Sequence, residues 1–191
     1  ELIKDITGDN KAKREEQLDV IIDEAKRLTE LVNEILVVSQ QNSTSKLNKT
    51  DFDFSELVES VVKKFDFDNS GYNFRRDVKK GLWVNADRHK IEQVLFNFIS
   101  NAVKYCGKDK EIIIVVKEAG GSARFDVFDH GNGISKQEQK YIWDRFSRAS
   151  QKYKRGDSTG LGLSIVRSIL KSHDAVFGVN SAVGKGSDFY F

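Results

Sequence analysis

The stretch Asn97-Phe98-Ile99-Ser100-Asn101-Ala102-Val103-Lys104-Tyr105 carries two opposed patterns. Asn97, Asn101 and Lys104 are spaced at i, i+4 and i+7, which predicts one polar helical face, while apolar residues at 91, 94, 95, 98 and 102 predict the opposite, core-facing side. Carbonyl oxygens one turn apart can bind a hard cation such as Mg²⁺, and a neighbouring ammonium can neutralise phosphate. A solvated helix face is the alternative that this segment alone leaves open.

Three glycine clusters follow. The alternating stretch 123–128 predicts a strand that ends in Asp129-His130-Gly131-Asn132-Gly133-Ile134, for which a plain turn is the alternative. Gly160-Leu161-Gly162-Leu163 opens the helical run 164–170, and free backbone N–H groups at a helix start predict an anion site. Gly184-Lys185-Gly186-Ser187 precedes a terminal strand at 188–191.

In this order, these segments resemble the ATP-binding catalytic domain of bacterial sensor histidine kinases, in the GHKL superfamily with the Bergerat fold. The matching boxes are called N, G1, F, G2 and G3, and here they fall at 97–105, 129–133, 142–148, 160–163 and 184–187. Each motif alone is weak, whereas five in the correct order are specific.

The resemblance implies an α+β protein: a long coiled-coil-type helix followed by a two-layer α/β sandwich, with helices covering one face of a mixed sheet. Residues 1–45 would end the dimerisation and phosphotransfer region, and residues 46–191 would form the ATP-binding domain. Independently, apolar residues at 18, 21, 25, 28, 32 and 35 step by three and four, which predicts a heptad seam that needs a partner. That partner is a second copy or the nucleotide-binding domain, and a solvated, partly frayed helix is the remaining alternative. The polar run 40–45 predicts a hinge.

Alternating helix and strand patterns fill the rest of the chain. We expect a short strand or staple at Phe52 and Phe54, strands at 72–78 and 82–84, and a hairpin of 112–116 with 124–128. Helices are predicted at 55–65, 87–105, 136–143 and from 164 onward. The polar stretch 147–159 lacks apolar periodicity and predicts a mobile lid.

The resemblance also implies roles for single residues. Asp129 would accept a hydrogen bond from the adenine amino group, Asn97 and Asn101 would hold Mg²⁺, and Lys104 would contact phosphate. Arg145 would reach the γ-phosphate during transfer, with an exposed helix-end cation as the alternative. The other residues expected to contact ATP are Tyr105, Gly131, Gly133, Ile134, Lys154, Arg155, Thr159, Gly160, Leu161, Gly162 and Leu163.

The sequence departs from the family at the acceptor histidine, which normally lies on the first dimerisation helix and is followed by an acidic residue. The histidines are His89, His130 and His173, and each reads as a surface or capping residue. We therefore expect a fragment that transfers the γ-phosphate of ATP to a histidine on a helix missing from this chain and that does not autophosphorylate. The alternatives are a GHKL-type ATPase and a non-catalytic ATP-binding regulatory module.

Composition bears on nucleic-acid binding, disulfide bonds and membrane-spanning segments. The net charge of +2 indicates no strongly basic surface for nucleic acid, and the single Cys106 excludes an internal disulfide. No apolar run reaches the ~20 residues that span a bilayer. The resemblance implies a homodimer formed through the heptad helix and a response regulator receiver domain as partner. It also implies a cytoplasmic domain of a longer protein attached to the inner membrane through a segment absent here.

Overall fold

The computed structural model describes residues 13, 15, 17, 18, 20, 21, 24, 47–68, 71–144 and 160–191. The chain divides into two compact units, Glu1–Thr44 and Ser45–Phe191. In the first unit the described positions are helical, and its described apolar residues Leu18, Val20 and Ile21 are exposed. Most of the predicted heptad seam, the hinge at 40–45 and the lid at 147–159 lie outside the described residues.

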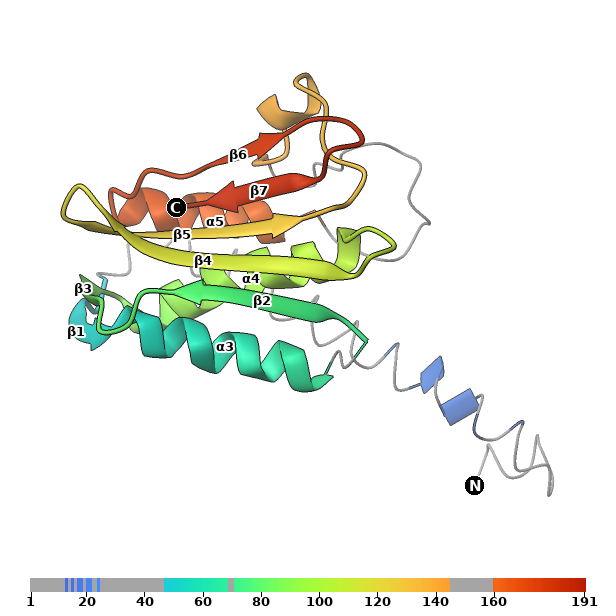
Figure 1. Cartoon of the computed structure of the whole chain (residues 1–191), viewed down its shortest axis with the longest axis horizontal. Coiled ribbons are helices and arrows are strands. Elements are labelled where there is room, and N and C mark those ends of the chain that lie inside the picture. The colour runs from blue at the N-terminus through green and yellow to red at the C-terminus, as the bar shows by residue number, and fades with distance from the viewer. Residues whose placement is uncertain are drawn as a thin grey trace. The chain divides into compact units, whose positions relative to one another are not determined.

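A five-stranded mixed sheet in the order β2-β4-β5-β7-β6 forms the second unit (Figure 1). β2 pairs parallel with β4, and the other neighbouring strands pair antiparallel. A separate two-stranded antiparallel sheet joins β1 (Thr50–Asp53) to β3 (Trp83–Ala86). The strands of the large sheet are β2 (Asn73–Val78), β4 (Glu111–Ala119), β5 (Ser122–Asp129), β6 (Gly178–Ser181) and β7 (Ser187–Tyr190).

Helices α3 (Phe54–Asp68), α4 (Arg88–Tyr105) and α5 (Gly162–Ser172) cover one face of this sheet (Figure 1). α4 packs against both of the other helices and therefore occupies the middle of the layer. The predicted α+β sandwich with helices on one face of a mixed sheet is confirmed. In the part of the chain that the structure describes, none of the helices has the length and apolarity needed to cross a membrane.

Local sequence signals explain why α4 forms where it does. It begins at the N-cap Asp87, whose side chain accepts a hydrogen bond from the Lys90 N–H. Its predicted apolar stripe is buried, and Phe98 at its centre packs against the rings of Phe189 and Phe191. Each large apolar side chain buried in this way contributes about 1.5–3 kcal/mol. The stripe therefore fixes the rotation of α4 and turns its amide side chains away from the core.

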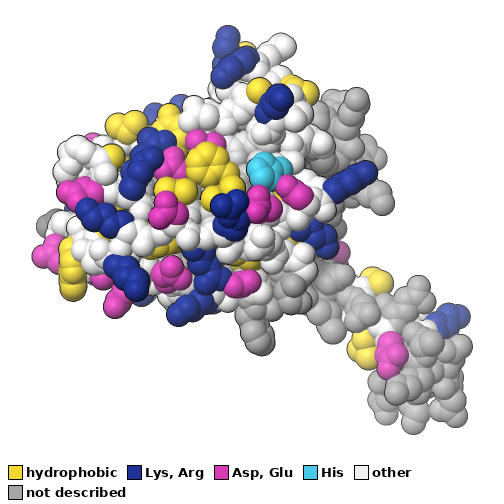
Figure 2. All heavy atoms as spheres, viewed as in Figure 1, with side chains coloured by type: hydrophobic (Ala, Val, Ile, Leu, Met, Phe, Trp, Pro, Cys, Tyr) yellow, Lys and Arg dark blue, Asp and Glu magenta, His cyan; other side chains and the backbone are white. Residues whose placement is uncertain are grey.

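The opposite face of the sheet is open to solvent. Ile113, Val115 and Phe128 point to this side by strand alternation and are half-buried. Figure 2 shows hydrophobic side chains gathered in the middle of this face with Lys, Arg, Asp and Glu side chains around them. The helices and the inner face of the sheet therefore form the core, while the outer face carries both hydrophobic and charged side chains.

The three histidines occupy surface or helix-end positions, as the sequence indicated. His89 and His130 are exposed, and His173 is the C-cap of α5. The Nε2 atom of His173 accepts a hydrogen bond from the Asp87 N–H at 3.1 Å. This contact ties the end of α5 to the start of α4.

One expectation about local structure was wrong, and one strand was missed. A helix was expected at 136–143, but the structure has only the 3₁₀ turn η1 (Glu138–Lys140). The Gln139 side chain donates hydrogen bonds to the carbonyl oxygens of Ile134 and Ser181, so this segment is fastened to β6 and does not extend as a free α-helix. β6 itself was missed, because Gly178-Val179-Asn180-Ser181 has neither strand alternation nor high β propensity.

Candidate functional site

A buried carboxyl group marks one end of the candidate site. Asp129 ends β5 and is only 5% exposed, and its Oδ1 accepts a hydrogen bond from the Gly131 N–H at 2.8 Å. Burial raises the pKa of Asp129 above its ordinary value, while hydrogen bonds from the backbone of Gly131 and Ser187 and the charge of His130 act in the opposite direction. A carboxylate in such a dry setting is a strong acceptor for a ligand N–H group.

Glycines allow three backbone segments to meet around Asp129. A Cβ on Gly131 would lie 2.0 Å from the Tyr105 carbonyl oxygen, and one on Gly186 would lie 1.9 Å from the Asp129 carbonyl oxygen. Gly133 has a φ of 68°, and its Cβ would lie 1.9 Å from the carbonyl oxygen of Ala182. The close approach that these glycines permit is therefore between protein segments: the end of α4, the turn after β5 and the turn before β7.

The other end of the site lies where α4 meets α5. Asn97 Nδ2 donates a hydrogen bond to the Gln93 carbonyl oxygen at 2.9 Å, so that donor is used within its own helix. A Cβ added to Gly162, the first residue of α5, would lie 2.8 Å from Asn97 Oδ1. An amide oxygen therefore faces a helix start, where backbone N–H groups and the helix dipole favour anions.

Helix α4 connects these two ends. Eight residues separate Asn97 from Tyr105, which corresponds to about 12 Å along the helix axis. Asn101 is half-buried between them, and Lys104 is exposed with its Nζ 5.7 Å from the centre of the Tyr105 ring. The arrangement suits an elongated ligand with a hydrogen-bonding base at one end and anionic groups with a cation at the other.

The structure describes most of the predicted site residues, and four lie outside its described part. Ile134 and Leu163 are half-buried, Leu161 is buried and Gly160 has a φ of 74°. The Ile134 N–H donates to Ser181 Oγ at 2.8 Å, which anchors the glycine turn to β6. The four residues outside the described part of the chain are Arg145, Lys154, Arg155 and Thr159.

Sequence reasoning missed Ser187 and Ser181 as neighbours of this site. Ser187 pairs with Asp129 across β5 and β7, and Ser181 Oγ also donates a hydrogen bond to the Gly186 carbonyl oxygen at 2.7 Å. The Gly184-Lys185-Gly186-Ser187 motif signalled that this region mattered. The motif did not indicate a role for any single residue, because the pairing of Ser187 with Asp129 joins residues far apart in the sequence and has no local signature.

The fold is an α/β sandwich, a mixed sheet with helices on one face. Along its central helix α4 lie a buried carboxyl group and the glycine-flanked start of α5. Together these features define a nucleotide-binding sandwich of the Bergerat type. The family described as "Histidine kinase-, DNA gyrase B-, and HSP90-like ATPase" matches residues 86–191, more than half of the sequence, and the chain belongs to this family.

Sensor kinases are among the proteins that this chain resembles. The signal transduction histidine-protein kinase ArlS of Staphylococcus haemolyticus is 32% identical over 178 residues, which cover 92% of this chain and 39% of ArlS. The histidine kinase ThkA, solved in complex with the response regulator TrrA, is 27% identical with a TM-score of 0.69 over 96% of this chain and 51% of that one.

A third comparison concerns the fold alone. Full-length ShkA, solved in complex with AMPPNP, matches with a TM-score of 0.78 and 24% identity over 94% of this chain and 38% of that one. The chain therefore spans about two fifths of the length of ArlS and of ShkA.

Proposed function

We propose that this chain is the ATP-binding catalytic part of a two-component sensor histidine kinase and that it transfers the γ-phosphate of ATP to a histidine on a dimerisation helix outside this sequence. The observation that supports this most directly is the placement of the buried Asp129 near the C-terminal end of α4 and of the Asn97 amide oxygen near the middle of that helix, facing the start of α5. The similarity to ArlS supports kinase chemistry over other uses of the fold.

Asp129 selects adenine in this proposal. The adenine amino group donates to the carboxylate, whereas guanine would place a carbonyl oxygen there and leave two acceptors facing each other. Losing a hydrogen bond to a buried charged group costs about 2 kcal/mol. Tyr105 and Ile134 flank the base, and Gly131 and Gly133 shape the turn beside it.

The opposite end binds the triphosphate. The side-chain oxygens of Asn97 and Asn101 are of the hard type that Mg²⁺ prefers, and Mg²⁺ when bound would neutralise phosphate charge. Lys104 and the backbone amides of 160–163 bind the phosphate oxygens. By resemblance, Arg145 contacts the γ-phosphate, and Lys154, Arg155 and Thr159 complete the nucleotide contacts. Transfer of this kind depends mainly on positioning and charge neutralisation.

The ATPase alternative is disfavoured by the only carboxylate of α4. Related ATPases usually place a catalytic glutamate on this helix, and Glu92 is the sole acidic residue that α4 has. Glu92 instead forms ion pairs with Lys64 at 3.2 Å and Arg88 at 3.8 Å. Five residues, or about 140° of rotation, separate it from Asn97, so Glu92 points away from the proposed phosphate end.

The proposal extends to partners and location of the longer protein. A second copy would pair through the heptad residues of 18–36, and the receiver domain of a response regulator would accept the phosphoryl group. The solved complex of ThkA with the response regulator TrrA supports such a partner. The domain would lie in the cytoplasm, with the full-length protein attached to the inner membrane.

Nucleotide titration tests the binding part of the proposal. Asp129→Ala should weaken binding of a non-hydrolysable ATP analogue by about 2 kcal/mol, roughly 30-fold, because the adenine amino group loses its acceptor. The exposed Asp77→Ala on β2 is the matched control and should bind normally. Equal affinity of the wild-type chain for GTP and ATP would refute the assignment of Asp129 to adenine.

Phosphoryl transfer needs its own test. With γ-labelled ATP, the chain should label a separately supplied dimerisation region that contains the acceptor histidine, and the label should be acid-labile. Without that region the chain should stay unlabelled. An acid-labile label on His89, His130 or His173 would contradict the view that the acceptor lies elsewhere, and steady phosphate release without transfer would favour the ATPase alternative.

A further inference from the structure

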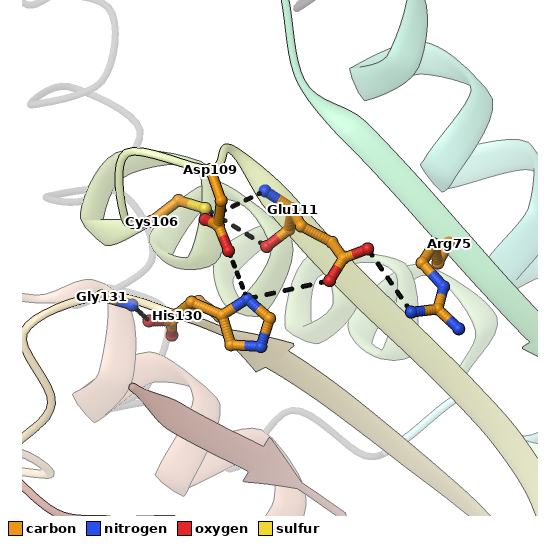
Figure 3. A network of polar contacts seen from close by, with 7 residues as sticks. Arg75, Cys106, Asp109, Glu111, His130 and Gly131 are labelled. Atoms are coloured by element: carbon orange, nitrogen blue, oxygen red, sulfur yellow. Dashed lines mark hydrogen bonds and ion pairs between the residues drawn. The ribbon is translucent and has the colours of Figure 1, made fainter. Parts of the chain in front are cut away.

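Three side chains with metal-binding atoms converge beside the turn that follows β5. Figure 3 shows Asp109 and Glu111, which precede and begin β4, facing the ring of His130, which follows β5. His130 Nδ1 lies 2.6 Å from Asp109 Oδ2 and 3.8 Å from Glu111 Oε2. One ligand atom from each residue lies within 4.8 Å of the other two. None of the three is among the residues proposed to contact ATP.

In each carboxylate, the oxygen that does not face His130 accepts a hydrogen bond from another group. Asp109 Oδ1 accepts the Glu111 N–H at 3.4 Å, which leaves Oδ2 toward the imidazole. Glu111 Oε1 accepts a hydrogen bond from Arg75 Nη1 at 3.4 Å, which leaves Oε2 toward the imidazole (Figure 3). Hydrogen bonds to the second oxygen of a ligating carboxylate, such as the one from Arg75, orient metal ligands in proteins.

We propose that Asp109, Glu111 and His130 form a binding site for a divalent first-row transition-metal ion such as Zn²⁺. One imidazole nitrogen and two carboxylate oxygens are a typical ligand set for such ions, and together the two carboxylates neutralise the charge of the ion. All three residues are solvent-accessible, so water can complete the coordination shell. The site is separate from the Mg²⁺ site on α4 and does not depend on the kinase assignment.

Small side-chain movements would produce the required geometry. Tetrahedral bonds of about 2.1 Å place ligand atoms about 3.4 Å apart, so the 2.6 Å contact must lengthen and the 3.8 Å contact must shorten. The ion would take the place of the hydrogen that His130 Nδ1 shares with Asp109. The imidazole then binds in its neutral form with its proton on Nε2, and any second ring proton is released to water.

The position of the site has a structural consequence. A Cβ on Gly107 would lie 2.3 Å from the His130 carbonyl oxygen, so the segment that carries Asp109 already packs closely on the turn after β5. A metal ion bridging the two segments would fix the position of His130, the neighbour of Asp129. Zn²⁺ should therefore raise the thermal stability of the chain without ATP present.

Calorimetric titration of the tag-free chain with Zn²⁺, in the presence of excess Mg²⁺, tests the site. We expect one ion per chain, with affinity weakened at least about tenfold by His130→Ala and by Glu111→Gln. The matched control is His89→Ala, which removes another exposed histidine and should leave the affinity unchanged. Wild-type affinity in His130→Ala, or an equal loss in His89→Ala, would overturn the proposal.

Two further measurements separate metal binding from other effects. Zn²⁺ should raise the Tm of the wild type and of Cys106→Ser, but not that of Glu111→Gln or Asp109→Asn. Cys106 is the single thiol of the chain, and its Sγ donates to the Glu111 carbonyl oxygen at 3.3 Å. Loss of Zn²⁺ binding in Cys106→Ser would contradict the three-residue ligand set. Circular dichroism of each variant without metal verifies that it is folded.

Discussion

At the level of single residues, burial of Asp129 opposes ionisation of its carboxyl group. Burial raises its pKa above the ordinary 3.8. Between pH 3.8 and that raised pKa, the folded chain binds more protons at this residue than the unfolded chain does. The contribution of Asp129 to stability therefore declines as pH rises through this window, and the full penalty is present above the raised pKa.

Asp129→Asn should remove this penalty. We expect the free energy of unfolding at pH 7 to equal or exceed that of the wild type and to vary less between pH 4 and 7, while discrimination of ATP from GTP decreases. Urea denaturation at several pH values measures the first effect and nucleotide titration the second. A variant less stable than the wild type at pH 7 would show that the carboxylate's hydrogen bonds outweigh its burial.

Asp126 is buried on the outer side of the sheet and depends on one partner. It is 3% exposed, and Arg124 Nε lies 2.9 Å and 3.0 Å from its two carboxylate oxygens, with the guanidinium 4.3 Å from the centre of the Tyr190 ring. Arg124→Ala would leave a buried charge unpaired and should lower the free energy of unfolding by about 3 kcal/mol. Chemical denaturation measures this loss.

The double variant Arg124→Ala/Asp126→Ala is the control for that prediction. Removing both charges should cost less than the sum of the two single changes, since no buried charge remains unpaired. Additive losses would mean that the pair contributes nothing beyond packing.

The sequence predicts the positions of single motif residues better than it predicts contacts between side chains. The position of Asp129 at a strand end before glycines was predictable from alternation and turn residues. The pairing of Arg124 with Asp126, and the meeting of His130 with Asp109, were not, because charged residues in a strand or turn read as ordinary surface until their neighbours in space are known.

At the level of elements, the turn between β6 and β7 separates two effects of glycine. Gly184 and Gly186 have nearly equal φ values, 76° and 77°. A Cβ on Gly184 would meet nothing within 4 Å, whereas one on Gly186 would lie 1.9 Å from the Asp129 carbonyl oxygen. Gly186 is therefore required both by its conformation and by the packing of this turn on β5.

Substituting each glycine by alanine should separate the two requirements. Gly184→Ala should cost about 1 kcal/mol, the typical price of a left-handed conformation for a residue with a Cβ. Gly186→Ala should cost several-fold more and should also impair ATP binding, because the backbone beside Asp129 must move. Urea unfolding of both variants compares them, and equal losses would contradict the packing argument.

A substitution where α4 meets α5 tests the proposed phosphate-binding end of the site. The methyl group of Gly162→Ala would lie 2.8 Å from Asn97 Oδ1, at the tip of a flexible side chain that can turn aside. We expect less than about 1 kcal/mol change in folding stability, but several-fold weaker Mg²⁺-dependent ATP binding. Titrations with and without Mg²⁺ measure this, and Ser168→Ala on the same helix is the control. Unchanged Mg²⁺ dependence would exclude the Asn97 oxygen from the cation site.

Elements with strong local signals were predictable, and those defined by distant partners were not. α4 had both an N-cap and an apolar stripe, and the β4–β5 hairpin had alternation around two glycines that adopt positive φ. β6 has no such pattern. The parallel pairing of β2 with β4 was also not predictable, because these strands precede and follow α4 in the sequence. The expected helix at 136–143 failed because side-chain contacts to Ile134 and Ser181 outweighed helical periodicity.

At the level of the whole molecule, the heptad pattern predicts self-association. Leu18 and Ile21 are exposed, and each large apolar side chain left in water forgoes about 1.5–3 kcal/mol of burial. If residues 18–36 mediate a dimer, Leu28→Asp and Ile35→Asp should shift sedimentation toward the monomer. A monomeric wild type at every concentration, unaffected by either change, would exclude this interface.

The order of the strands also determines when the protein can acquire its binding site during synthesis. β7 lies between β5 and β6, and Ser187 pairs with Asp129 across 58 residues of sequence. On the ribosome the β4–β5 hairpin emerges early, but one edge of β5 has no partner until β7 has left the exit tunnel. A nascent chain that already contains every residue of α4 and α5 should therefore not retain ATP, and its unpaired β5 edge should be a target for chaperones or aggregation.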